Sequence, residues 1–100
     1  MRNLYNSGRR DGNEDEIKDY LREKSIPFIA LVPGQGADLI VLLHDFSVFV
    51  ENKNPNSPKA RQQLTETEEK LQALCHHRRL PYEVVFSRED MASVISKYGE

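Results

Sequence analysis

The sequence predicts a single α/β domain, in which helices flank a mixed sheet and the elements follow the order α-β-β-β-α-β-α. Three observations support this fold class. The chain has 100 residues with five glycines and five prolines, which suits one small core. Apolar runs of strand length lie at residues 28–32, 37–43, 46–53 and 81–86. Helical periodicity precedes the first run and follows the last two, so we expect the fourth strand to join the sheet in parallel through a right-handed crossover.

The first helix is predicted in "NEDEIKDYLREK", residues 13–24. Asn13 is a favourable N-cap, and the three acidic residues near it suit the positive end of the helix dipole. Pro27 ends the helix before the first strand. One face of this helix carries Ile17, Tyr20, Leu21 and Lys24.

Residues 28–32 and 37–43 are predicted as the first two strands, separated by the turn "PGQG". The second run, "ADLIVLL", lacks polar alternation, which predicts burial on both faces of the sheet. "HD" at residues 44–45 interrupts the apolar residues, and residues 46–53 form the third strand. These two strands therefore form a hairpin, and a polar loop rich in Asn and Pro follows it.

Two capping-box patterns mark the remaining helices. Thr65 and Glu68 begin the helix in "LTETEEKLQALCHHR", and Ser87 and Asp90 begin the helix in "SREDMASVISKY". The fourth strand, residues 81–86, lies between them. The inward-facing side chains are predicted to be Leu71, Leu74 and Cys75 in the first of these helices and Met91, Val94, Ile95 and Tyr98 in the second.

The composition argues against a disulfide-stabilised, membrane-spanning or secreted protein. The lone cysteine cannot form an internal disulfide, and no apolar run approaches the roughly 18 residues that a membrane span needs. No apolar segment of a signal peptide follows the basic residues at the start of the chain. We therefore expect a cytoplasmic protein without a membrane partner.

The net charge of −2 gives the whole chain no strong field for nucleic acid, so any such binding must come from local patches. Residues 1–12 are expected to form a basic, flexible arm of the single domain that spans residues 1–100. The candidate basic residues are Arg2, Arg9 and Arg10 in this arm, Lys59 and Arg61 after the third strand, and "HHRR" at 76–79.

The hairpin brings charged residues together. If the turn at His44 and Asp45 closes a loop of two or four residues, Asp38 lies directly opposite Glu51. Lys53 shares their face because side chains alternate along a strand. Two carboxylates with Cβ atoms roughly 4.5–5.5 Å apart repel each other unless a cation or a proton lies between them.

Two carboxylates beside an amine suit metal-assisted hydrolysis of a phosphodiester. Hard oxygen ligands favour Mg²⁺ or Mn²⁺. Lys53 could orient or deprotonate the attacking water, or stabilise the pentacoordinate phosphorus, and the spacing does not separate these roles. The alternative is a simple salt bridge between Lys53 and Glu51 or Asp38 at the end of a strand.

The segments "GADLIV" and "VFVENK" resemble the D-(x)n-E-x-K signature of the PD-(D/E)xK nuclease superfamily, whose core has the order α-β-β-β-α-β. Together with "RRDGNEDEIKDYL", "QLTETEEK" and "EVVFSRED", they resemble the small stand-alone nuclease-like proteins of phages and prophages that are related to the VRR-NUC nucleases. This resemblance covers roughly residues 9–95 and implies a restriction-endonuclease-like core.

The resemblance implies that Asp38 and Glu51 bind the metal, together with the backbone carbonyl of Asn52, and that Lys53 is the catalytic lysine. It places a further catalytic acid of the first helix at Glu16, although helical periodicity does not choose between Glu14 and Glu16. Ala37 and Asn52 depart from the usual pattern, which has proline before the aspartate and an apolar residue between the glutamate and lysine.

Three other patterns have simpler explanations. Cys75, His76 and His77 point in different directions on a helix and cannot bind one zinc ion together. "GQG" leads into a strand, so the helix N-terminus of a phosphate loop is missing. The relatives carry Glu or Gln at the position of Glu68, but the capping box already explains this residue, and a surface loop explains Gln62 and Gln63.

The charged cluster and the resemblance together imply a metal-dependent DNA endonuclease, and the resemblance implies branched or junction DNA as substrate and the cytoplasm of a phage-infected or prophage-carrying bacterium as location. Arg9, Arg10, Lys59 and Arg61 are the expected DNA contacts. The family suggests a homodimer and no nucleotide cofactor. The main alternative is a non-catalytic DNA- or protein-binding module of the same fold, while the lack of a second apolar lobe argues against a small phosphoester as substrate.

Overall fold

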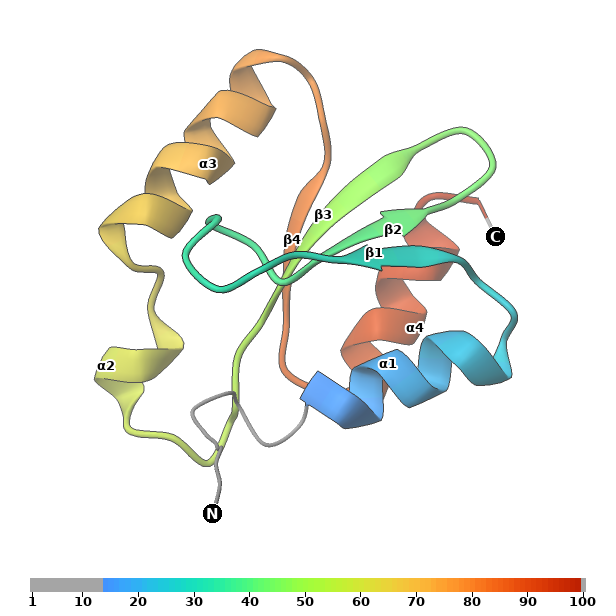
Figure 1. Ribbon diagram of the computed structural model, residues 1–100, viewed down its shortest axis with the longest axis horizontal. Coiled ribbons are helices and arrows are strands. Elements are labelled where there is room, and N and C mark those ends of the chain that lie inside the picture. The colour runs from blue at the N-terminus through green and yellow to red at the C-terminus, as the bar shows by residue number, and fades with distance from the viewer. Residues whose placement is uncertain (1–13, 100) are drawn as a thin grey trace.

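The computed structural model describes residues 14–99 (Figure 1). It contains the seven predicted helices and strands and one short helix, α2, that the sequence did not predict. In chain order the elements are α1 (Glu14–Glu23), β1 (Phe28–Ala30), β2 (Leu39–Leu42), β3 (Ser47–Asn52), α2 (Lys59–Gln62), α3 (Glu66–His77), β4 (Tyr82–Val85) and α4 (Arg88–Lys97).

The four strands form one mixed sheet in the order β1-β2-β3-β4. The first two pairings are antiparallel, and β4 lies parallel to β3. The predicted α/β class, with a parallel strand added through a helical connection, is therefore confirmed. Within residues 14–99, no helix has the length and apolarity needed to cross a membrane.

Helices cover both faces of the sheet. Figure 1 shows α3 on one side of the strands and α1 with α4 on the other. The larger core lies on the α1 and α4 side, where Ile17 and Leu21 of α1 and Met91 of α4 are fully buried. The smaller core lies under α3 and is centred on Cys75 and Tyr82. The sheet therefore lies between two apolar layers.

The helix starts follow their predicted caps closely. The Thr65 hydroxyl accepts the N–H of Glu68 at 3.2 Å, and the Glu68 carboxylate accepts the N–H of Thr65 at 2.9 Å, which confirms the capping box of α3. Ser87 caps α4 by accepting the Asp90 N–H, but the Asp90 carboxylate accepts from Phe86, one residue before the predicted partner. The predicted cap Asn13 lies outside the described residues.

Other predictions need correction. Leu74 was expected to face inward but is 54% exposed, because α3 contacts the sheet along the narrow stripe that contains Leu71 and Cys75. The β2 residues were expected to be buried on both faces. Leu39 and Val41 are fully buried, but Ile40 is only half-buried, because the smaller core under α3 covers that face less completely.

The turn before β2 packs closely against α3 and is hydrogen-bonded to β4. A Cβ atom at Gly36 would lie 2.9 Å from Leu71 Cβ and 3.2 Å from the Thr67 carbonyl oxygen. The Tyr82 hydroxyl donates to the Gly36 carbonyl at 2.7 Å. Because β2 follows this turn after only two residues, these contacts also fix the position of Asp38.

Replacing Gly36 by Ala is expected to lower the free energy of unfolding more than replacing Gly34 by Ala. Both glycines have positive φ angles, +95° and +92°, so both substitutions share a cost of about 1–2 kcal/mol. Only a Cβ at Gly36 would overlap with α3, and this overlap adds about 1–3 kcal/mol to the loss in the free energy of unfolding. Urea unfolding of the two variants measures the difference, and equal losses would contradict the close approach to α3.

Candidate functional site

The β2–β3 hairpin has the predicted register. Leu39 pairs with Val50, and Asp38 comes one residue before β2. The ladder is irregular at Asp38, because its N–H donates at 2.9 Å to the carbonyl of Val50, which is already the partner of Leu39. On the other side of β3, the N–H of Lys53 donates to the Val85 carbonyl at 2.9 Å. Lys53 is therefore held by the ladder with β4, while Asp38 lies at the irregular start of β2.

The three predicted residues share the α3 face of the sheet. Val48 and Val50 belong to the core under α1 and α4, and Phe49 packs in the core under α3. Alternation along β3 consequently directs Glu51 and Lys53 toward α3. Glu51 is 5% exposed and Lys53 is 6% exposed, which is unusual burial for charged residue types.

Lys53 lies between two glutamates. Its Nζ is 2.9 Å from Glu68 Oε1 and 3.4 Å from Glu51 Oε2. The closer partner is therefore the helix residue, and the sequence interpretation of Glu68 as a cap alone was incomplete. One signal in the sequence could have indicated it. Glu68 precedes Leu71 by three residues, so it continues the stripe of α3 that faces the sheet.

Asp38 and Asn52 are joined by a hydrogen bond. The N–H of Asn52 donates to Asp38 Oδ2 at 2.8 Å. The N–H and C=O of one strand residue point to the same side of the strand, so the Asn52 carbonyl also points toward Asp38, beyond the end of β2. This is the orientation that the resemblance requires of a backbone ligand. The Asn52 side chain lies on the opposite face and is buried.

Burial gives Glu51 an unusual protonation state. Desolvation, reinforced by the negative charges of Asp38 and Glu68, raises its pKa from 4.5 to about 9, and the positive charge of Lys53 offsets only part of this effect. At neutral pH the Glu51 carboxyl therefore keeps its proton. It hydrogen-bonds to the Glu68 side chain, with the protonated Glu51 carboxyl as donor and the Glu68 carboxylate as acceptor.

Lys53 and Glu68 remain ionised. Burial by itself would raise the pKa of Glu68, but hydrogen bonds from Lys53 and from the Thr65 N–H lower it overall. Burial would likewise lower the pKa of Lys53, but the hydrogen bond to Glu68 and the charge of Glu51 raise it overall. The site thus holds an ammonium–carboxylate pair next to a protonated acid.

Tyr82 borders this cluster from β4, which the sequence did not indicate. Burial, together with the charges of Glu51, Glu68 and Asp38, raises the pKa of its hydroxyl. The hydroxyl therefore stays protonated and donates to the Gly36 carbonyl. Tyr82 connects the carboxylate cluster to the turn that positions Asp38.

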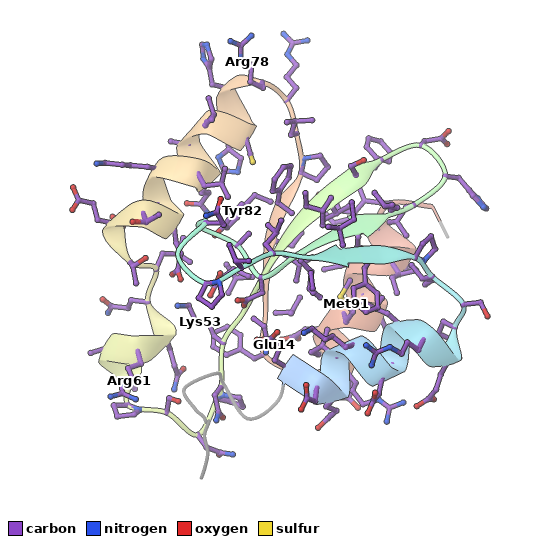
Figure 2. The ribbon with its side chains drawn as sticks, in the orientation of Figure 1. Glu14, Lys53, Arg61, Arg78, Tyr82 and Met91 are labelled. Atoms are coloured by element: carbon purple, nitrogen blue, oxygen red, sulfur yellow. The ribbon has the colours of Figure 1, made fainter. Side chains whose placement is uncertain are left out.

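The structure distinguishes the two candidate acids of α1. Glu14 is buried, and its carboxylate lies 2.9 Å from Lys18 Nζ. Glu16, the position implied by the resemblance, is exposed. Figure 2 shows Glu14 at the start of α1. Of the two candidate acids, Glu14 is therefore the buried one.

The predicted DNA contacts are distributed unevenly. Lys59 and Arg61 are exposed on α2, the short helix that links β3 to α3. Figure 2 shows Arg61 on α2 and Arg78 at the far end of α3, so the cluster at 76–79 lies away from the start of α3 that holds Glu68. Arg2, Arg9 and Arg10 lie outside the described residues.

The site offers an oxygen-only set of metal donors. Among residues 14–99, no three His, Cys, Asp or Glu side chains are grouped so that they could hold a metal ion. The Asp38 and Glu51 carboxylates and the Asn52 carbonyl fit the way Mg²⁺ is held by one or two protein carboxylates, with water and substrate phosphate as further ligands. Cys75 is buried whereas His76 and His77 are exposed, so these three side chains point in different directions.

Comparison of the chain with protein-family models, with curated proteins and with solved structures gave no match. The function proposed below therefore rests on the residues and contacts of this chain.

The protonation state of Glu51 predicts a pH-dependent stability. Because the pKa is raised from 4.5 to about 9, the folded state retains a proton that the unfolded state loses above pH 4.5. The stability that this proton contributes is fully present below pH 4.5 and is lost as the pH rises through about 9. Over this range the free energy of unfolding falls by up to about 1.4 kcal/mol per pH unit. Glu51→Gln, which is neutral throughout, should remove this slope and be more stable than the wild type at pH 8–9.

Urea unfolding between pH 5 and 9 in the presence of a chelator measures this effect. Glu66→Gln is the matched control, because the Glu66 side chain is 82% exposed and should leave the slope unchanged. A Glu51→Gln variant with the slope of the wild type would show that Glu51 is ionised in the folded protein.

Proposed function

We propose that this chain is a divalent-metal-dependent DNA endonuclease with the restriction-endonuclease-like fold of the PD-(D/E)xK superfamily. The observation that supports this proposal is the cluster of the buried Glu51 and Lys53 with the half-buried Asp38, whose negative charge acts on Glu51. The mixed sheet with helices on both faces is compatible with that fold. The chemistry is hydrolysis of a phosphodiester bond, and the favoured substrate is branched or junction DNA.

The donor set supports a divalent cation. The negative charges of Asp38 and Glu68 contribute to holding the proton on Glu51, and a cation between the carboxylates would satisfy the same charge in place of that proton. Bound Mg²⁺ or Mn²⁺ supplies Lewis-acid stabilisation of charge on the phosphate. Asp38, Glu51 and the Asn52 carbonyl would hold it, and Glu14 would supply the helix acid.

The electrostatics favour one of the roles open to Lys53. Its pKa is raised overall by Glu68 and Glu51, so the side chain is an ammonium ion and a poor general base. A fixed positive charge can instead stabilise the negative charge that grows on the phosphate oxygens in the transition state. We therefore assign charge stabilisation, and not proton abstraction, to Lys53.

The proposed DNA contacts come from a few basic residues and not from the net charge of the chain. Lys59 and Arg61 follow the site along the chain on α2, and Arg9 and Arg10 precede it. Since the net charge is −2, these few cations would supply the attraction for phosphates, and binding should weaken steeply with salt. A homodimer, which would pair two such surfaces, is part of the proposal.

Cleavage of labelled DNA tests the proposal. Four-way junction, flap, single-stranded and linear duplex DNA are incubated with the wild type in Mg²⁺ or Mn²⁺ and in chelator. Lys53→Met should lower the cleavage rate by about 100-fold or more, because it removes charge that stabilises the transition state. Asp38→Asn should also abolish cutting, since an amide keeps an acceptor for the Asn52 N–H but loses the charge that holds metal.

The control is Lys70→Met, which removes an exposed lysine of α3 that pairs with Glu66 and should cleave like the wild type. Wild-type protein that binds DNA but cuts no substrate would instead support a non-catalytic binding module. Cleavage by Lys53→Met at the wild-type rate would remove Lys53 from the mechanism.

A further inference from the structure

One oxygen atom of Glu68 accepts two hydrogen bonds that come from different parts of the fold. Glu68 Oε1 accepts the backbone N–H of Thr65 at 2.9 Å, which closes the capping box of α3. The same atom accepts from Lys53 Nζ at 2.9 Å. A helix cap alone requires only the first of these bonds. The second bond links the start of α3 to the end of β3, across 15 residues of chain.

We propose that Glu68 is a positioning residue that holds the Lys53 ammonium in place, and that the hydrogen bond from the Thr65 backbone N–H fixes the Glu68 side chain for this task. The inference rests on the proposed function, in which Lys53 stabilises charge on the reacting phosphate.

The need for such a residue follows from the chemistry of lysine. Its side chain has four flexible carbons and an ammonium group with three rotatable donors, so strand geometry places the Cα of Lys53 but not its Nζ. Glu51 holds this group less closely, with its Oε2 at 3.4 Å, and Glu51 is itself assigned to the metal. Glu68 is therefore the partner that remains available while the metal ligands are occupied.

Glu68 is well fixed by its surroundings. Its rotamer is restrained by the capping bond to Thr65, and its helix is seated on the sheet through Leu71 and Cys75. The close approach of Gly36 to Leu71 and Thr67 restrains the same turn of α3. The Glu68 side chain is only 15% exposed, so water competes little for its oxygens. A rigid acceptor of this kind is what a flexible ammonium needs.

Three variants separate positioning from helix capping. Glu68→Ala removes both bonds and should lower kcat by about 10–100-fold with little change in KM. Glu68→Gln keeps an oxygen that can accept from both Thr65 and Lys53 and should restore most of kcat. Thr65→Ala removes one capping bond but leaves Glu68, so it should lower Tm while keeping kcat near the wild-type value at a temperature where it is folded. Equal losses of kcat in Glu68→Ala and Thr65→Ala would overturn the inference.

A second measurement needs no cleavage. The rate at which an amine-acylating reagent modifies Lys53 at fixed pH, read by mass spectrometry, reports how firmly the ammonium is held. Glu68→Ala should raise this rate about tenfold or more, because a hydrogen bond to a charged group is lost. Lys70 serves as an internal control, since it is exposed and paired only with Glu66 in the described contacts, and its rate should not change.

The two measurements distinguish the possible failures. If the wild type cuts no DNA but Lys53 becomes reactive in Glu68→Ala, Glu68 still positions Lys53 and the proposed nuclease function fails. If the reactivity of Lys53 is unchanged in Glu68→Ala, the positioning inference fails whatever the cleavage result.

Discussion

The antiparallel register of β2 against β3 is the constraint on which the candidate site depends. Leu39 opposite Val50 brings Asp38 close enough to Glu51 for its charge to act on that carboxyl, and a slip of one residue would move one carboxylate to the other face of the sheet. The apolar side chains prevent that slip. Val48 and Val50 are fully buried under α1 and α4, while Phe49 packs under α3. The alternation that builds the two cores therefore also builds the charged cluster.

The docking of α3 adds a second requirement. The sheet alone would bring Lys53 near Glu51 and Asp38, but α3 contributes Glu68, to which Lys53 lies closest. Gly36 permits this approach because it has no Cβ to meet Leu71 and Thr67. The turn before β2, the start of α3 and the end of β3 thus form one unit, with Tyr82 joining them from β4.

The cluster is an electrostatic compromise. Glu51 and Lys53 are buried and Asp38 and Glu68 are partly buried, which is unfavourable for charged groups unless they are paired. Three features offset this cost of burial: the Lys53–Glu68 ion pair, the backbone N–H donors to Asp38 and Glu68, and the proton on Glu51. A buried carboxyl with a pKa near 9 contributes less to stability than an apolar residue would. Such local conflict with stability is typical of functional sites.

The sequence by itself determined the features that depend on neighbours along the chain. Alternation indicated the hairpin register and the shared face of Asp38, Glu51 and Lys53 on the condition that the turn has an even number of residues, and local side-chain chemistry indicated the capping box of α3. Only the tertiary structure decided which acid holds Lys53, because that depends on how closely α3 approaches the sheet. For the same reason, it decided that Leu74 is exposed and that Glu14, and not Glu16, is buried. Periodicity assigns a residue to a face of its helix, but the width of the stripe covered by other elements is set by contacts between segments far apart in sequence.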